Sequence, residues 1–279
     1  MSKWEIVKDL LRHRTAAFGL GIIVLFILTA LIGPWLAPYD PIIPAPQERL
    51  QRPSHKHIFG TDALGRDVFS RVLYGARISM VIGLISVGIS SVGGTLLGLT
   101  AGYFGGRLDT VIMRLMDIML AFPAILLAIF ITALLGPNLQ NTMIAVGIVY
   151  IPRFARLVRS SVLSLKEELF VQAIVHLGGS HLRVMFKHVL PNALPPIIVF
   201  ATLGLGMSVL QAAALGFLGL GAQPPQAEWG AMLSDGRKYL QLAPHVAVFP
   251  GGAILLFVLG YNLLGDGLRD VLDPTLKSL

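Results

Sequence analysis

Long apolar runs constrain the fold of this chain more than any other feature of its sequence. Six runs carry few or no charges, and each is close to the roughly 20 residues that a membrane-spanning helix needs. They are residues 16–37, 78–102, 111–135, 141–165, 192–220 and 246–264. Only 13% of the residues are charged, against about 25% in soluble domains. We therefore expect an all-α membrane protein with six transmembrane helices.

The basic residues predict which ends of the spans face the cytoplasm. The segment 1–15 is polar and basic, and the run 16–37 exceeds the apolar core of a signal peptide, which is about 7–15 residues. We expect a cytoplasmic N-terminal segment, 1–15, and a membrane domain, 16–279, with both termini in the cytoplasm. The loops are then an outer loop at 38–77, a cytoplasmic loop at 166–192 and an outer loop at 221–245. Most Lys and Arg residues fall on the inner side, as the positive-inside rule predicts.

Several classes of function are disfavoured by what the sequence lacks. It has no G-x-x-x-x-G-K-[ST] stretch, so we do not expect it to hydrolyse ATP by itself. It has no cysteine, and its net charge of +7 lacks the basic-aromatic pattern of nucleic-acid binders. His55 and His57 share an irregular loop, where two histidines are more often solvated than metal-bound. We expect neither an enzyme, nor a metal site, nor a nucleic-acid partner.

The loop 166–192 is the longest polar interruption in the second half of the chain. Its pattern predicts two short helices, at 166–177 and 181–189. The first carries apolar residues at helical spacing, namely Leu169, Ala173, Ile174 and Leu177. The second carries an apolar set too, made of Leu182, Met185, Phe186 and Val189. Its basic residues are His176, His181, Arg183, Lys187 and His188.

Glycine and proline mark the boundaries of these two helices. Gly178 and Gly179 are expected to break the first helix, and Ser180 to cap the second. Pro191 is expected to end the second helix, because the residue before a proline resists the helical conformation. The result is a compact element that fits either an ordinary basic loop between spans or a docking element for a soluble partner.

Three short stretches of this loop form a recognisable set. They are Gln172-Ala173-Ile174, Gly178 and His188-Val189-Leu190-Pro191-Asn192. The set resembles the coupling loop of ABC-importer permeases, and its ending is typical of the dipeptide/oligopeptide/nickel branch. Gln172 and Ile174 depart from the usual Glu and Ala. We call residues 166–192 the coupling loop. Similar stretches elsewhere are Gly60-Thr61-Asp62, Gly65-Arg66-Asp67, Ser70-Arg71, residues 217–221, Glu228-Trp229-Gly230 and residues 261–274.

The resemblance implies a type I ABC-importer-like permease subunit of the C type, a multi-pass protein of the bacterial cytoplasmic (inner) membrane. It implies a second homologous permease, two ATPase subunits that bind ATP and Mg, and an extracytoplasmic solute-binding protein. The chain itself would bind no cofactor. Dipeptides or oligopeptides are the expected substrates, with glutathione and nickel chelates as alternatives. The residues expected to couple transport to the ATPases are Gln172, Ala173, Gly178, Arg183, His188, Leu190 and Pro191.

Polar residues within the spans are further candidates. Arg114 and Asp117, in the run 111–135, can pair on one helical face and form a gate or subunit contact, and Pro123 is expected to kink that span. Gln211 could line a polar path or bond another helix. At the inner end of the next span we expect membrane-interface anchors, namely Arg153, Arg156 and Arg159. A stripe of small residues allows close helix approach at Ser90, Gly94, Gly98 and Gly102.

The predicted outer loops carry charged and aromatic residues. Four of them could pair on a short helix; the simplest interpretation is a solvated amphipathic segment, and the alternative is a contact made by the outer loop. They are Asp62, Arg66, Asp67 and Arg71. Trp229 is interpreted either as a membrane-interface residue or as a contact for an external binding protein.

Two other classes of function were weighed against the importer. An ion-driven secondary transporter would need ionisable residues near the middle of the membrane and often an inverted repeat. Asp117 is expected near one end of its span, and the two halves of the sequence show no visible similarity. A membrane scaffold without transport would still need a partner for the coupling loop. Co-purifying ATPases and ATP-dependent uptake separate the three classes.

Overall fold

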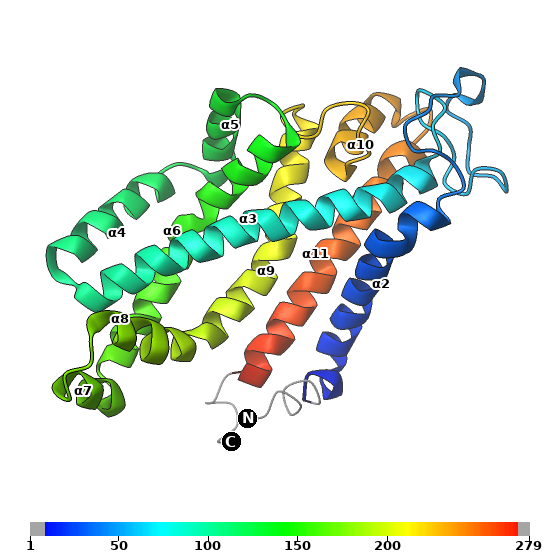
Figure 1. The fold of residues 1–279 in the computed structure, drawn as a ribbon. Coiled ribbons are helices and arrows are strands. Elements are labelled where there is room, and N and C mark those ends of the chain that lie inside the picture. The colour runs from blue at the N-terminus through cyan, green and yellow to red at the C-terminus, as the bar shows by residue number, and fades with distance from the viewer. Residues whose placement is uncertain (1–8, 273–279) are drawn as a thin grey trace.

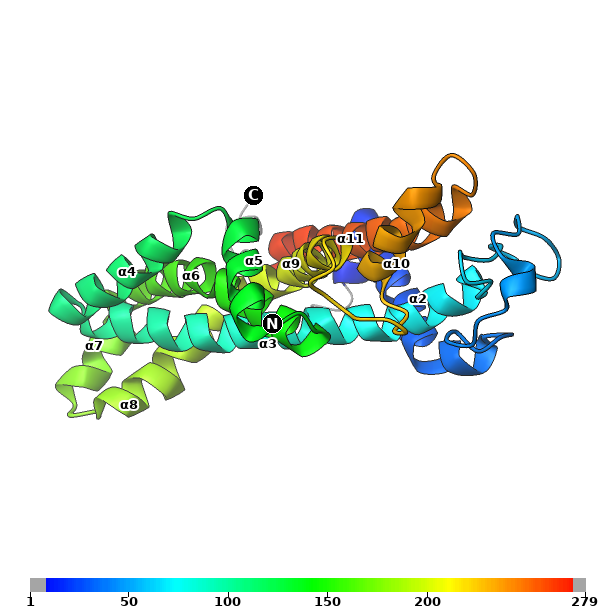
Figure 2. The ribbon, with the colours of Figure 1, turned by 90° about the horizontal axis from the view of Figure 1, so that it is seen from above.

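The structure, a computed structural model, describes residues 9–272, which fold almost entirely into helices. The long helices lie side by side in a flat, elongated bundle, as two perpendicular views show (Figures 1 and 2). The all-α membrane fold expected from the sequence is confirmed. Most of the expected cytoplasmic segment, including Lys3 and Lys8, and the chain from Asp273 onward lie outside the described residues.

Long membrane-type helices alternate with short connecting helices. They are α2 (Arg14–Leu36), α3 (Val68–Phe104), α4 (Gly106–Leu120), α5 (Ala124–Leu135), α6 (Leu139–Lys166), α7 (Leu169–His176), α8 (His181–Arg183), a π-helical turn (Val184–Val189), α9 (Leu190–Phe217), α10 (Trp229–Gly236) and α11 (His245–Leu272). Two 3-10 turns, Pro46–Glu48 and Arg237–Tyr239, complete the helical elements.

The part of the chain from residue 9 to 272 contains five helices that are long and apolar enough to cross a bilayer singly. A sixth span exists only if α4 and α5 count together, because they meet at a bend of 93°. The span expected at 111–135 is therefore divided into two helices, α4 and α5. The kink expected at Pro123 is confirmed as a full break, since this residue precedes α5 and a proline cannot donate a backbone hydrogen bond.

The helix α3 begins at Val68, well before the span expected at 78–102. Asp67 caps its start, where the side chain accepts a hydrogen bond of 2.7 Å from the backbone N–H of Ser70. The cap makes the polar segment continuous with the apolar run. The separate short helix expected to carry Asp62, Arg66, Asp67 and Arg71 is wrong, because only Arg71 lies within α3.

The small-residue stripe of α3 packs closely against α6, as expected. A Cβ atom at Gly94 would lie 2.3 Å from the Cβ atom of Phe154. One at Gly98 would lie 2.3 Å from the carbonyl oxygen of Ala155. Neither position has room for a larger side chain, so the two helices are held at a short interaxial distance.

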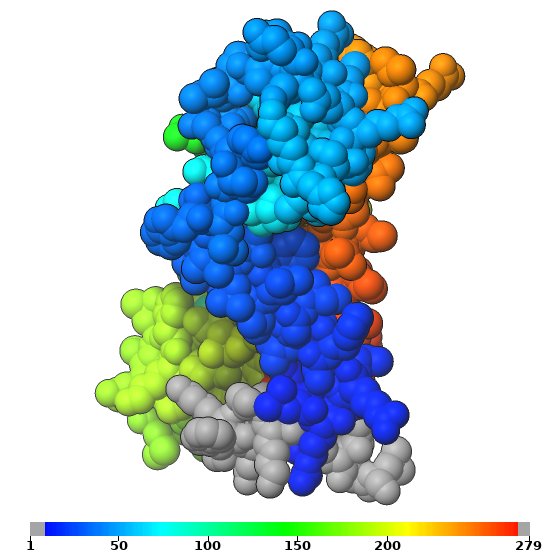
Figure 3. All heavy atoms as spheres, turned by 90° about the vertical axis from the view of Figure 1, so that its right-hand side faces the viewer, coloured from blue at the N-terminus to red at the C-terminus, as the bar shows by residue number. Residues whose placement is uncertain are grey.

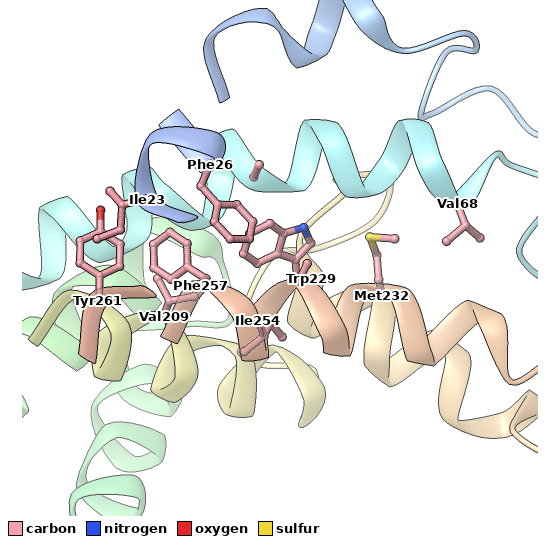
Figure 4. Packing of buried hydrophobic residues seen from close by; sticks show 12 residues of the cluster. Ile23, Phe26, Val68, Val209, Trp229, Met232, Ile254, Phe257 and Tyr261 are labelled. Atoms are coloured by element: carbon pink, nitrogen blue, oxygen red, sulfur yellow. The ribbon is translucent and has the colours of Figure 1, made fainter. Parts of the chain in front are cut away.

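A second core lies between α2, α3, α10 and α11. Trp229 is fully buried there, with its ring edge-to-face with Phe26 at 5.6 Å and near Phe257 (Figure 4). Its indole N–H donates to the carbonyl oxygen of Val72 at 3.1 Å, and Gly75 leaves space for the ring. The exposed position expected for Trp229 is therefore wrong, because α10 folds back against the long helices.

Candidate functional site

The coupling loop forms a helical hairpin that projects from one end of the bundle (Figures 1 and 3). Its corner is Gly178, whose φ of +82° lies in the left-handed region that favours glycine. The backbone N–H of Gly179 closes the turn onto the carbonyl oxygen of Ile174 at 3.0 Å. The break expected at this pair is confirmed. Ser180 is the residue before α8, but the cap expected from its side chain is wrong, since the hydroxyl makes no capping bond.

Buried apolar side chains fix the base of the hairpin to the bundle. Val171 of α7 and Val184 of the π-helical turn are almost fully buried. They belong to one cluster with Leu99 of α3 and Val162 of α6. Because protein cores are close-packed, such a base transmits displacement instead of absorbing it.

Two hydrogen bonds tie the same base to the last turn of α3. The hydroxyl of Tyr103 lies 3.0 Å from Nδ1 of His181. The Lys166 ammonium donates to the carbonyl oxygen of Tyr103 at 3.0 Å. The rings of Tyr103 and Phe104 also pack edge-to-face on the His181 ring. Sequence reasoning missed this anchor. The available signal was an aromatic pair directly before Gly105 and Gly106.

The second arm of the hairpin runs into α9 without interruption, so the helix stop expected at Pro191 is wrong. One continuous helix extends over His181–Phe217. The π-helical turn just before Pro191 widens the backbone, and the N–H of Leu190 bonds the carbonyl oxygen of Met185. The side chain of Asn192 donates to the carbonyl oxygen of His188 at 2.6 Å. These changes accommodate a proline, which has no N–H to give.

The outer surface of the hairpin carries large apolar side chains among polar and charged ones. Leu169, Leu177 and Leu182 expose 82%, 87% and 68% of their surface, and Phe170, Val175 and Phe186 are also exposed. The periodic leucines of α7 therefore face outward, while Val171 faces the core. Single exposed leucines are ordinary, but several on one projecting element indicate an interaction surface.

The residues expected to couple transport occupy different parts of this hairpin. Ala173, Arg183 and Pro191 are exposed, whereas Gln172, His188 and Leu190 are partly buried. The side-chain amide of Gln172 donates to the carbonyl oxygen of Glu167 at 3.1 Å. Gly178 forms the tip. The structure thus brings the set together on one small element, with α7 and α8 on either side of the corner.

Ion pairs join α4 to α6, but they differ from the expected one. Asp117 bonds Arg156 at 2.6 Å, so the expected pair of Asp117 with Arg114 is wrong. The carboxylate of Asp109 accepts two bonds from Arg159, at 2.5 and 2.6 Å. Arg114 is exposed. The acidic residues of α4 meet the next span because the turn at Gly105 folds α4 back along α6.

The charged residues of the loop before α3 form a buried network at the opposite end of the molecule. Asp62 accepts a bond of 2.7 Å from Nε of Arg66, and Arg71 donates to the carbonyl oxygen of Pro41 at 2.8 Å. His57 lies between Asp67 and Glu48, 2.9 and 3.0 Å from their carboxylates. The solvated segment expected here is wrong. All four predicted contact residues hold the loop itself together: Asp62, Arg66, Asp67 and Arg71.

Gln211 lies within α9, away from the coupling loop. Its side-chain nitrogen is buried and has no hydrogen-bond partner within residues 9–272. A buried amide without a hydrogen-bond partner is unfavourable in a single chain, so a further hydrogen-bonding group would be accommodated beside Gln211.

Comparison with known proteins is consistent with these features. Residues 94–278 match the family model of the binding-protein-dependent transport system inner membrane component. Residues 2–53 match the N-terminal TM domain of oligopeptide transport permease C. A dipeptide transport system permease protein of Alkalihalophilus pseudofirmus is 54% identical over 279 residues, which is 100% of this chain and 92% of that one.

Two further relatives are also transport system permease proteins, and one solved structure shares the fold. A glutathione transport system permease protein of Pectobacterium atrosepticum is 48% identical and covers 96% of this chain and 89% of its own. A di/tripeptide transport system permease protein of Pseudomonas aeruginosa is 48% identical, over 98% of this chain and 92% of that one. The inward-facing MetNI methionine ABC transporter aligns with a TM-score of 0.56 and 20% identity, over 72% of this chain and 95% of that one.

Proposed function

The chain belongs to the family of binding-protein-dependent transport system inner membrane components, and we propose that it carries di- or oligopeptides as one half of an ATP-driven importer. It is a permease subunit of an ABC importer and a multi-pass membrane protein. The peptide substrate is supported by the dipeptide and di/tripeptide relatives. Glutathione, itself a tripeptide, is the second candidate, because a glutathione permease is 48% identical.

We further propose that the coupling loop docks on a cytoplasmic ATPase. The observation that carries this proposal is the exposed leucine surface on a rigidly anchored tip. An apolar tip in the cytoplasm needs a partner that covers it. The proposed complex contains a second permease, two ATPase subunits that hold ATP and Mg, and a solute-binding protein outside. The chain lies in the bacterial cytoplasmic membrane with both termini inside, which the distribution of Lys and Arg supports.

The continuous helix His181–Phe217 explains how movement of the tip would reach the membrane. When the ATPases close on ATP, a displacement of the coupling loop would tilt α9. Two largely apolar cavities of about 620 and 560 Å³ lie along this helix, and both include residues of α11 in their walls. A tilt of α9 would change the shape of both cavities, which would open the path alternately to the two sides.

Replacing Leu177 with Asp tests the docking surface. The chain is expected to remain in the membrane, because this side chain is 87% exposed and supports no core. ATPase subunits that co-purify with the wild-type chain in mild detergent should be lost. Leu242→Asp, at a residue 69% exposed beyond α10, is the matched control and should retain them. Wild-type recovery of the ATPases with Leu177→Asp would contradict the docking role.

A further inference from the structure

One arginine of the membrane-type helix α6 has no acidic partner in the described part of the chain. Arg153 stands midway along α6, beside the packed stretch where Gly94 of α3 meets Phe154. One and two turns further along, Arg156 and Arg159 are each paired with an aspartate of α4. The three arginines expected to serve as one group of anchors are therefore not equivalent.

The direction of the Arg153 side chain argues against a membrane-interface anchor. An anchor would extend from Arg153 toward Lys166, at the coupling-loop end of α6. Instead the guanidinium lies over the ring of Tyr150, 5.0 Å from its centroid and one turn nearer the opposite end. Tyr150 is buried, so the aromatic face holds the charge at mid-helix by a cation–π contact. Arg153 is exposed on the surface of the single chain, and a charged group within a span is costly unless it faces protein or water.

Arg153 borders a small cavity between α3, α6 and α9. The cavity measures about 70 Å³, and its walls include Ser90, Ser208 and Gly204 as well as Tyr150. Whole ligands occupy pockets of about 300–1,000 Å³, so this one fits an end group and not an entire peptide. Most of its walls are apolar, and the Arg153 guanidinium is its one charged group, beside the hydroxyls of Ser90 and Ser208. A carboxylate matches that set, because arginine binds carboxylates through two parallel hydrogen bonds.

We propose that Arg153 is a substrate-binding residue of the transport path, where it holds the carboxylate at the C-terminus of a passing peptide. The inference rests on the proposed function, since it assumes that this face of α6 and α9 lines the path. Tyr150 is a positioning residue that keeps the guanidinium beside the cavity. An acidic residue of the partner permease is the competing occupant, and the test below separates the two.

The absence of cysteine allows a direct measurement of the electrostatic field at this cavity. Met207 lines the same cavity and is 39% exposed, so Met207→Cys provides a reporter. In vesicles that contain the whole complex, its rates of reaction with negatively and positively charged methanethiosulfonates are compared. The label is read on this chain by mass spectrometry. Gly204→Cys serves as a second reporter if the first does not assemble.

With each rate divided by that reagent's rate with a free thiol in solution, the negative reagent should react faster than the positive one when Arg153 is present. Arg153→Gln should lower that ratio by on the order of tenfold, as expected for loss of a nearby charge in a partly shielded site. Tyr150→Phe should keep the ratio and Tyr150→Leu should reduce it. Leu25→Cys, on an exposed face of α2, is the control for lipid-facing positions and should react poorly with both. A ratio that Arg153→Gln leaves unchanged, or reporters that react with neither reagent, would overturn the proposal.

Measurements of peptide uptake and of complex assembly show whether Arg153 binds the peptide carboxylate or an acidic residue of the partner permease. For a peptide-binding role, the Arg153→Gln complex should assemble normally, and its half-saturating peptide concentration should rise by roughly tenfold or more. Loss of the partner permease from the purified complex would show an intersubunit ion pair and overturn the proposal. If the wild-type complex takes up no peptide while the labelling result holds, the proposed peptide function fails and the anion site stands.

Discussion

The hydroxyl of Tyr103, at the end of α3, lies 3.0 Å from Nδ1 of His181, the first residue of α8. The contact joins the coupling loop to a 37-residue helix that begins in the buried network at the far end of the molecule. This bond supports the coupling loop in addition to the continuous α8–α9 arm and the buried apolar base. A lever needs more than one support, because one flexible attachment would let it rotate freely.

Tyr103→Phe should loosen this support without removing the aromatic packing on His181. A lost hydrogen bond of this kind costs about 0.5–1.5 kcal/mol. We expect faster amide hydrogen exchange across α7 and α8, and slower peptide uptake at an unchanged amount of complex. Tyr39→Phe removes a comparable bond, 3.1 Å to the carbonyl oxygen of Lys56, and should leave exchange in the coupling loop unchanged. Identical exchange in Tyr103→Phe and wild type would contradict the role of the bond.

Gly178→Val should separate ATP hydrolysis from transport. No atom lies within 4 Å of a Cβ placed there, so the whole cost comes from φ of +82°. For a residue with a side chain this conformation costs about 1–2 kcal/mol, which relaxation of the corner would relieve. The chain should still enter the membrane, yet ATPase activity should no longer drive uptake. Gly88→Val, in an equally open position within α3, is the control. Normal uptake by Gly178→Val would exclude a rigid corner.

The sequence predicted the helices well because membrane spans are set by simple composition. Runs of about 20 apolar residues need only be long enough, and a sharp corner at Gly178 needs only a residue that tolerates positive φ. These features are local. The helix stop at Pro191 was predicted wrongly, because a π-helical turn precedes this proline and Pro191 lies in the first turn of α9, where a missing N–H is tolerated. The π-helical turn depends on residues before the proline that its own identity does not predict.

Predictions about side-chain partners were less successful, because partners come from other helices. Asp117 was assigned to Arg114 at helical spacing, but the corner at Gly105 and Gly106 brings it to Arg156. Trp229 follows a turn-rich segment that suggests exposure, yet α10 inserts it between α2 and α11. Neither the partner of Asp117 nor the burial of Trp229 is determined by residues within one helical turn of it in the sequence.

Trp229→Ala should destabilise the chain severely, because it empties the centre of the core in Figure 4. Large-to-small changes of this kind cost about 3–5 kcal/mol. We expect little folded protein and a lowered melting temperature for what remains. Trp35→Ala is the matched control, at a residue 82% exposed, and should alter stability by about 0.5 kcal/mol or less. Equal yields of the two variants would show that the buried ring is not a principal support.

Glu228→Gln should change how stability depends on pH. Glu228 is buried at the start of α10, where its carboxylate accepts bonds from the N–H groups of Gly230 and Ala231 at 2.8 and 2.9 Å. Burial raises the pKa of this carboxyl above its ordinary value of 4.5, although the two hydrogen bonds oppose the shift. The folded state then holds the proton more tightly than the unfolded state. The contribution of Glu228 to the unfolding free energy is therefore greatest below pH 4.5 and declines as pH rises through the raised pKa.

The measurement is the melting temperature of the purified complex between about pH 4 and 8, compared for wild type and Glu228→Gln. Glutamine does not titrate, so the wild-type value minus the variant value should fall with rising pH. Glu48→Gln supplies a control of opposite sign, because hydrogen bonds from Lys56 and His57 lower the pKa of Glu48. Its contribution is present above pH 4.5 and is lost on acidification, so that difference should rise with pH. If the Glu228 difference were flat or rose as well, its carboxylate would be stabilised by the two backbone donors, and the start of α10 would hold a permanent negative charge.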